Sequence, residues 1–194
     1  MAALREFILG GQRSGKSRRA ELLASHWLAQ CADHKAVMIA TAIAWDDEMA
    51  ERITRHQQDR AQRVPGMRVV EEQIMLAQAV QTCSNPQTLV IVDCLTLWLT
   101  NCLMPHENTV TSISKKSVAN DFRAQVASLS GAIKSTTGPV VLVGNEIGLG
   151  VIPMGRKTRE FVDALGRLNQ EVAAVCERVT FMAAGLPLFL KGQA

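Results

Sequence analysis

The chain has 194 residues, of which 47% are hydrophobic and 20% are charged. These values are ordinary for a globular protein, and the length suggests one domain over residues 1–194 with a full core. A net charge of +3 without a long basic run gives no reason to expect nucleic-acid binding. No uncharged apolar stretch is long enough to span a bilayer.

The cysteines and the N-terminus indicate a cytoplasmic protein. None of the five cysteines has a C-x-x-C partner, so we interpret them as reduced thiols that mostly fill the core. The N-terminus lacks the charged, apolar and cleavage regions of a signal peptide. We therefore expect a cytoplasmic location and no metal site built from cysteine.

The first half of the chain alternates apolar runs with amphipathic segments. Either Asp46 or Asp47 can cap the second helix, and Ser84-Asn85-Pro86 breaks the third. In chain order the pattern predicts a strand at 4–9, a helix at 17–29, a strand at 36–41, a helix from 46 or 47 to 59, a turn at 62–66, a strand at 69–70 and a helix at 73–81.

The second half continues the alternation. It predicts a strand at 89–92, a helix at 95–103, a mobile loop at 104–116, a helix at 118–133, a strand at 140–143, a helix at 156–178, a strand at 179–182, a turn at 185–187 and a strand at 188–190. The fold class is therefore α/β, with a mainly parallel sheet flanked by helices and an antiparallel C-terminal edge strand.

The first strand leads into a Walker A sequence, G-x-x-x-x-G-K-S, which opens the first helix. Glycines at these positions let backbone N–H groups approach phosphate oxygens, and the helix N-terminus favours negative charge. Lys16 would reach the β- and γ-phosphates, and Ser17 would bind Mg²⁺. The candidate nucleotide contacts are Leu9, Gly10, Gly11, Gln12, Arg13, Ser14, Gly15, Lys16 and Ser17.

The apolar strand at 89–92 ends in Asp93, which is the Walker B pattern. We expect Asp93 to hold the Mg²⁺ shell, through water, from the strand beside the Walker A strand. Together the two motifs predict a P-loop NTPase domain of the RecA-like kind. Two other segments, Ala40-Thr41-Ala42 and Asn145-Glu146, also follow strands, where open α/β sheets bind ligands. From position alone they are equally well plain loop residues.

The helix predicted after the second strand carries His56 between two arginines. Arg52 and Arg60 lie one turn to either side of it, while Met49 and Ile53 are expected to face inward. A histidine among arginines suits an anionic ligand. It equally suits a solvated surface, and spacing alone favours the surface interpretation.

Several motifs together resemble the bifunctional adenosylcobinamide kinase/adenosylcobinamide-phosphate guanylyltransferase family of cobalamin biosynthesis. The resemblance covers nearly the whole chain in the family's order. The shared sequences are GGxRSGKS at 10–17, IAT at 39–41, DDEMxxRIxxH at 46–56, VDCLTLWLTN at 92–101, NEIGLGVIP at 145–153, REFVDALGRLNQ at 159–170 and AGLPL at 184–188.

The resemblance implies two reactions in one site. The family phosphorylates the aminopropanol hydroxyl of adenosylcobinamide with ATP or GTP, then transfers GMP from GTP to that phosphate through a histidine. His56 matches this histidine. The resemblance also implies Mg²⁺ as cofactor, a corrinoid partner and a homo-oligomer, a trimer in the family. Its nucleotide contacts beyond the Walker A loop map to Ala40, Thr41, Ala42, Gln57, Gln58, Asp59, Arg60, Glu71 and Asp93.

The chemistry of a histidine carrier is sound, because neutral imidazole is a competent nucleophile with a reference pKa of about 6.5. Since the imidazole must approach the α-phosphate in one step only, we expect the helix carrying His56 to shift with nucleotide state. The chain departs from the family pattern at Gln12, at Met67 and in the stretched segment 60–65.

Two other functions fit parts of the sequence. A monofunctional P-loop kinase for another small molecule would use Lys16 and Asp93 and leave His56 on the surface. A nucleotide-dependent switch or ATPase module would act through a protein partner. The later motifs argue against the first, and the lack of an Asn-Lys-x-Asp base motif argues against the second.

Overall fold

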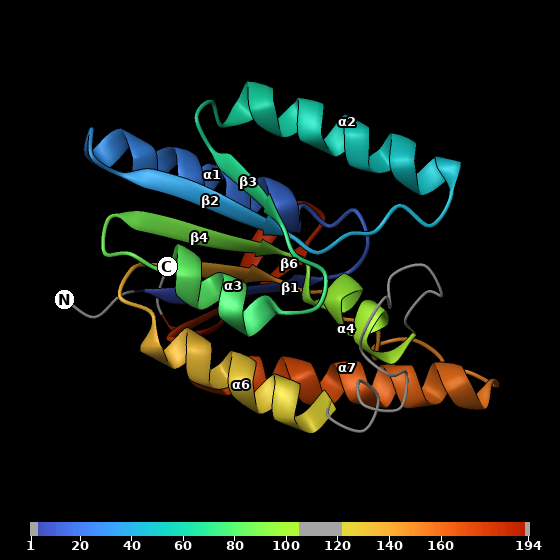
Figure 1. Cartoon of the computed structure of the whole chain (residues 1–194). Helices are drawn as coiled ribbons and strands as arrows, with labels where there is room; N and C mark the ends of the chain where they lie inside the picture. The colour runs from blue at the N-terminus through green and yellow to red at the C-terminus, as the bar shows by residue number, and fades with distance from the viewer. Residues whose placement is uncertain (1–3, 105–121, 193–194) are drawn as a thin grey trace.

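The computed structural model describes residues 4–104 and 122–192. The strands of the described residues are β1 (Arg5–Gly10), β2 (Lys35–Ala40), β3 (Arg68–Glu71), β4 (Thr88–Asp93), β5 (Val140–Val143), β6 (Arg178–Ala183) and β7 (Leu186–Lys191). They build a seven-stranded sheet in the order β3-β2-β4-β5-β1-β6-β7 (Figure 1). Neighbouring strands run parallel except β6 and β7. The predicted mainly parallel sheet with an antiparallel C-terminal edge is confirmed.

Helices cover both faces of the sheet. They are α1 (Lys16–Gln30), α2 (Asp47–Arg63), α3 (Leu76–Cys83), α4 (Leu95–Leu103), α6 (Phe122–Ser135) and α7 (Arg156–Val175). In Figure 1, α1 and α2 lie above the sheet, and α3, α4, α6 and α7 lie below it. Each face has its own hydrophobic cluster. Phe7 and Ile8 are successive, fully buried residues of β1 that belong to opposite clusters, which explains the apolar run of this strand.

The Walker A and Walker B strands are not neighbours. β5 pairs with β1 on one side and with β4 on the other, so it separates the two. The expectation that Asp93 stands on the strand beside the Walker A strand is therefore wrong. Sequence order could not reveal this, because β5 is formed by residues almost 50 positions after β4. The carboxyl end of β5 consequently lies between the two motifs.

The predicted helices form, with shifted ends. α2 extends past residue 59 to Arg63, whose guanidinium contacts the buried Glu21 of α1 at 3.2 Å. α3 begins at Leu76, and the Glu72 carboxylate accepts hydrogen bonds from the two amides just before it. α7 ends at Val175 rather than at residue 178, since Arg178 already pairs with β1.

The C-terminal hairpin turns earlier than predicted. Ala184 and Gly185 have φ angles of 51° and 80° and connect β6 to β7. Leu186 and Pro187, expected in the turn, already pair with β6. Two-residue hairpin turns of this kind require positive φ at both positions, which an alanine adopts only at some cost. The predicted edge strand at 188–190 is confirmed and is longer than expected.

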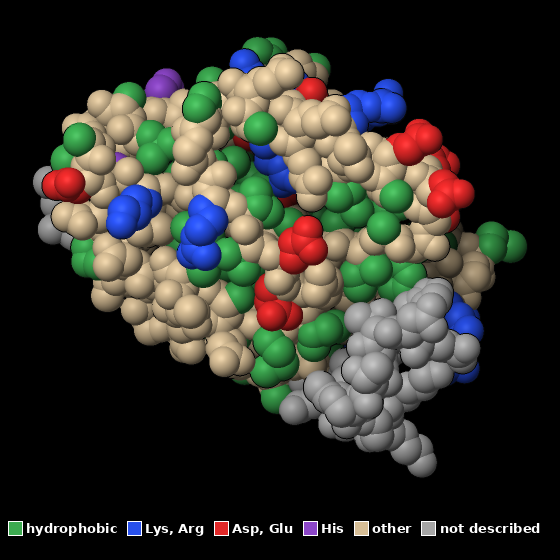
Figure 2. Space-filling view, turned by 45° about the horizontal axis from the view of Figure 1, so that its top comes forward, with side chains coloured by type: hydrophobic (Ala, Val, Ile, Leu, Met, Phe, Trp, Pro, Cys, Tyr) green, Lys and Arg blue, Asp and Glu red, His purple; other side chains and the backbone are tan. Residues whose placement is uncertain are grey.

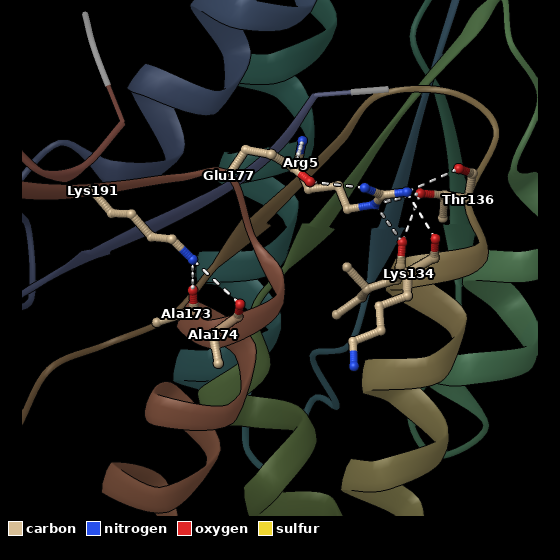
Figure 3. A network of polar contacts seen from close by, with 8 residues as sticks. Arg5, Lys134, Thr136, Ala173, Ala174, Glu177 and Lys191 are labelled. Atoms are coloured by element: carbon tan, nitrogen blue, oxygen red, sulfur yellow. Dashed lines mark hydrogen bonds and ion pairs between the residues drawn. The ribbon is translucent and has the colours of Figure 1, made fainter. Parts of the chain in front are cut away.

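The amino ends of the strands are closed by a polar network (Figure 3). Arg5 of β1 donates to the last carbonyls of α6, at Ile133 (2.7 Å) and Lys134 (2.8 Å), and pairs with Glu177 at 2.9 Å. Lys191 of β7 donates to Ala173 at the end of α7. Cations at helix C-termini satisfy free carbonyls and complement the helix dipole. This end of the sheet is thus structural.

Most of the predicted loop 104–116 and the start of the helix predicted at 118–133 lie outside the described residues. Within residues 4–104 and 122–192, no helix combines the length and the apolar character that crossing a membrane requires.

Candidate active site

The loop between β1 and α1 has the conformation that a phosphate-binding loop needs. Gly10 and Gly15 have φ angles of 152° and 101°, a region that favours glycine. A Cβ on Gly10 would collide with the carbonyl oxygen of Met182 on β6. The amide of Gly185 donates to the carbonyl of Ser14 at 3.0 Å. The β6–β7 hairpin therefore contacts the Walker A loop at Gly10 and Ser14 and supports its conformation.

Lys16, the first residue of α1, turns back into this loop. Its Nζ donates a hydrogen bond to the carbonyl oxygen of Gly11 at 2.6 Å, and the residue is only 8% exposed. Burial lowers the pKa of Lys16, and the neighbouring Cys94 and Asp93 raise it in part. An anion such as a phosphate would stabilise this desolvated ammonium, which has one carbonyl partner.

Asp93 stands at the end of β4 beneath α2. Burial raises the pKa of its carboxyl, and the nearby charges of Arg60 and then His56 lower it in part. Arg60 Nη1 lies 3.8 Å from Asp93 Oδ2. Burial thus disfavours the ionised form of Asp93, and the Arg60 guanidinium offsets part of this cost. A second cation would stabilise the carboxylate further.

One face of α2 points at Asp93 and Lys16. Along α2, whose residues are all described, Arg60 alone is buried, and its Nε donates to the carbonyl of His56 at 3.0 Å while Nη1 contacts the sulfur of Met38. His56 is exposed. Arg52, one turn earlier, also lowers the pKa of Lys16 and of Asp93 by its charge. Arg52, His56 and Arg60 therefore line the site, and Figure 2 shows basic and acidic side chains in and around a hollow on this part of the surface.

The expected inner face of α2 is confirmed, but it is only partly buried. Met49 and Ile53 are half-buried on a mostly exposed helix, and Arg60, two turns after Ile53 on the same face, makes the buried contact. A helix that docks by a charged side chain rather than an apolar stripe is less firmly attached than the others. This arrangement suits a helix that shifts during the reaction.

Thr41 has a different environment from the one expected of a nucleotide contact. It is fully buried, and its Oγ1 accepts from the amide and donates to the carbonyl of Cys94, at 2.9 and 2.8 Å. Asn101 of α4 donates to the Thr41 carbonyl at 2.8 Å. The Thr41 hydroxyl therefore ties β2 to β4 directly beneath Asp93. Sequence patterns gave no signal for the part that Asn101 plays.

The segment after β5 reaches the Walker A loop. The amide of Glu146 donates to the Gly10 carbonyl at 3.2 Å, and the amide of Asn145 donates to Thr96 Oγ1 at 2.9 Å. Asn169 of α7 donates to the carbonyl of Asn145 at 3.1 Å. Asn145 and Glu146 are thus fixed between β1 and β4.

Other predicted nucleotide residues lie at the edges of this arrangement. Gln57 and Gln58 are exposed on α2, and Asp59 pairs with Arg63 at 3.2 Å. Glu71 is exposed at the end of β3, the edge strand, in register with Ala40. Their part in binding stays a prediction, and so does that of Gln12 and Arg13, which are exposed on the loop.

The donor set fits Mg²⁺ better than a soft metal. The hydroxyl of Ser17 at the start of α1 and the carboxylate of Asp93 are hard oxygen ligands. The described residues contain no cluster of three or more histidine, cysteine and acidic side chains. Burial, reinforced by Asp93, raises the pKa of Cys94 to about 11, so this neighbouring thiol stays protonated and is a poor ligand.

Comparisons with known proteins identify sequence relatives. The family model described as cobinamide kinase/cobinamide phosphate guanyltransferase matches residues 6–190. The chain is 40% identical over 190 residues to the bifunctional adenosylcobalamin biosynthesis protein CobP of Pseudomonas aeruginosa, covering 98% of this chain and 99% of that protein. It is 33% identical over 186 residues to the protein CobU of Escherichia coli K12, with the same description, covering 95% and 98%.

A solved structure shows the fold. The chain resembles the flagellar accessory protein FlaH of Methanocaldococcus jannaschii with a TM-score of 0.51 and 10% identity, over 98% of this chain and 79% of that one. At this identity the likeness concerns the fold alone. With one strand between the Walker A and Walker B strands, the predicted RecA-like arrangement is confirmed.

Proposed function

Because the chain belongs to the cobinamide kinase/cobinamide phosphate guanyltransferase family, it is a bifunctional transferase of cobalamin biosynthesis, and we propose that one nucleotide site between the Walker A loop and α2 serves both reactions. The observation that carries this proposal is the face of α2 formed by Arg52, His56 and Arg60, which lies over Lys16 and Asp93.

The kinase step uses the loop side of the site. Backbone amides of the loop orient the triphosphate, and Lys16 exchanges the Gly11 carbonyl for a phosphate oxygen. Ser17 and, through water, Asp93 would hold Mg²⁺, which would supply neutralisation of the charge on the phosphates. The acceptor hydroxyl attacks the γ-phosphorus, and the nucleoside diphosphate leaves.

The guanylyl step uses the α2 side. A neutral ring nitrogen of His56 attacks the α-phosphorus of GTP, the N–P bond forms, and pyrophosphate leaves. The phosphate oxygen of the corrinoid phosphate then attacks the same phosphorus and releases the imidazole. Arg52 and Arg60 offset the negative charge that collects between α2 and Asp93. His56 is exposed, and Arg60 holds its backbone carbonyl. We therefore expect α2 to move toward the Walker A loop in this step, so that the imidazole reaches the α-phosphate.

The corrinoid acceptor approaches from the segment after Glu146. In residues 147–154 several apolar side chains are almost uncovered, such as Val151 (96% exposed) and Leu149 (79%). Val151 and other residues of this segment line a groove of about 390 Å³ together with the first turns of α7. A groove this small would take an edge of the macrocycle rather than the whole of it. Val151→Asp is expected to raise the KM for the corrinoid without changing the labelling of His56. An unchanged KM would exclude this segment.

The guanylyl step has a direct test. The protein is incubated with Mg²⁺ and GTP labelled at the α-phosphate, then denatured, and we expect acid-labile label on the wild type and none on His56→Asn. His26→Asn is the matched control, because His26 is exposed on α1. Unlabelled wild type would leave a monofunctional kinase. Label that persists on His56→Asn would assign the carrier to another residue.

Assembly and location also belong to the proposal. The family resemblance supports a homo-oligomer, specifically a trimer, and five cysteines without a C-x-x-C pair support a cytoplasmic location. Sedimentation equilibrium measures the first and cell fractionation the second. A monomer at micromolar concentration, or activity recovered outside the cytoplasmic fraction, would contradict the respective statement.

A further inference from the structure

The kinase step needs a group that accepts the proton of the attacking hydroxyl. Topology limits where this group can stand. The hydroxyl must approach the γ-phosphate between the Walker A loop on β1 and Asp93 on β4, and β5 is the strand between them. The carboxyl end of β5 continues into Asn145 and Glu146.

Glu146 is fixed in this position from two sides. Its amide donates to the carbonyl of Gly10, the first residue of the Walker A sequence. The preceding residue is held by Thr96, which follows Asp93 by three positions. The side chain is half-buried, and Oε1 accepts from the amide of Gly148 at 2.6 Å. Within residues 4–104 and 122–192, the hydrogen bond recorded for Oε2 is a long contact of 3.4 Å from Asn169 Nδ2. Oε2 is therefore the oxygen with free capacity.

The other carboxylates near the strand ends have different positions or partners. Asp93 faces Arg60 and is needed for Mg²⁺. Glu72 accepts two amides at the start of α3. Glu71 stands on the edge strand, separated from β5 by β2 and β4. Among the described residues, Glu146 is thus the carboxylate placed between the Walker A loop and Asp93.

We propose that Glu146 is the general base of the kinase step. This role rests on the proposed function and deepens it. As the acceptor oxygen forms its bond to the γ-phosphorus, the bond from that phosphorus to the β–γ bridging oxygen breaks, and the hydroxyl proton passes to Glu146 Oε2. The carboxyl later releases the proton to water. The exposed apolar segment begins at the next residue, so the acceptor hydroxyl and the base enter the site from the same side.

The two half-reactions differ in their need for this base, which makes the test selective. Transfer of GMP uses a phosphate oxygen that is already ionised and a histidine that carries its own lone pair. Glu146→Gln keeps the shape and removes the basicity. We expect it to lower kcat of adenosylcobinamide phosphorylation by about 10²- to 10⁴-fold. We expect His56 labelling, and GMP transfer to separately prepared adenosylcobinamide phosphate, to stay within about threefold of wild type.

Further variants separate catalysis from structure. Glu171→Gln removes an exposed carboxylate near the end of α7 that does not line the corrinoid groove, and it should leave all three activities unchanged. Glu146→Asp should recover part of the kinase rate, and the acid limb of the kinase pH profile should vanish in Glu146→Gln. Equal loss of all three activities in Glu146→Gln would assign a structural role and overturn the proposal. An unaffected kinase rate would overturn it as well, whereas a wild type without kinase activity would instead refute the proposed function.

Discussion

Arg60 Nη1 lies 3.8 Å from Asp93 Oδ2, and its Nε donates to the carbonyl oxygen of His56 at 3.0 Å. One buried guanidinium therefore connects the end of β4 to the turn of α2 that carries the proposed nucleophile. The rest of α2 is exposed or half-buried. The position of His56 relative to the nucleotide site thus depends on this arginine more than on apolar packing.

Removing this arginine should loosen the attachment of α2 to the end of β4. Arg60→Gln is expected to slow the labelling of His56 by GTP at least about tenfold, which corresponds to about 1.4 kcal/mol. It should also speed amide hydrogen exchange in α2, because the helix loses its buried anchor. Arg55→Gln, an exposed position on the same helix, is the control. Equal exchange rates in wild type and Arg60→Gln would show that another contact holds the helix.

The Walker A loop offers a matched pair of glycines. Gly10→Ala places a Cβ against the Met182 carbonyl at a φ of 152°, and we expect it to cost about 1–3 kcal/mol of unfolding free energy and to abolish nucleotide binding. The neighbouring Gly11→Ala meets open space, and its φ is not positive. It should change the stability by less than about 0.5 kcal/mol. Urea unfolding and nucleotide titration measure both, and similar effects of the two variants would contradict the structure.

Lys16 serves nucleotide binding but lowers the stability of the nucleotide-free protein. Since burial lowers the pKa of Lys16, the charged form is disfavoured in the folded state, and the unfolded chain binds the proton more tightly. Stability therefore rises as pH increases through the folded and then the unfolded pKa. Lys16→Met should be at least as stable as wild type at pH 7 without nucleotide, and this advantage should shrink at higher pH.

Thermal unfolding across pH measures this difference, and the same variant should lose both transferase activities. A Lys16→Met protein that unfolds well below wild type at pH 7 would show that the bond to the Gly11 carbonyl outweighs the cost of burial. Retained kinase activity in this variant would contradict the role given to the Walker A loop.

The network at the amino ends of the strands predicts an acid-sensitive contribution. Partial burial raises the pKa of Glu177, but hydrogen bonds from Arg5 outweigh this, and the pKa ends below its ordinary 4.5. The stabilisation is present above pH 4.5 and is lost as pH falls through the folded pKa. Because the Glu177 side chain is 48% exposed, Glu177→Gln should cost less than about 1 kcal/mol at pH 7.

Arg5→Met should cost more than Glu177→Gln, about 1–3 kcal/mol, because it also removes the hydrogen bonds to two carbonyls at the end of α6, that of Ile133, which is part-buried, and that of Lys134. Urea unfolding at pH 7 and pH 3 distinguishes the two. The deficit of Glu177→Gln should disappear at the lower pH, and most of the Arg5→Met deficit should remain. A pH-independent Glu177→Gln deficit would exclude the ion pair as its cause.

Local patterns predicted much of the molecule. The run Leu89 to Val92 is buried on both faces of the sheet, so it had to be apolar throughout, and this made β4 recognisable. The Walker A loop was recognisable because its glycines meet a backbone requirement that few sequences satisfy. Element ends were less predictable, as at α3, which begins at Leu76 although the Glu72 carboxylate already binds the two amides just before it.

The sequence by itself determined the α/β class, the Walker A loop and, through several separated motifs, the family. These are properties of neighbouring residues and of spacing along the chain. Tertiary structure alone decided that β5 lies between the Walker A and Walker B strands, that the Thr41 hydroxyl bonds to the backbone of Cys94, and that Arg60 docks α2. Each of these depends on strand order and on contacts between residues more than 20 positions apart. Chain entropy and packing of the whole sheet select such contacts, and no local pattern records them.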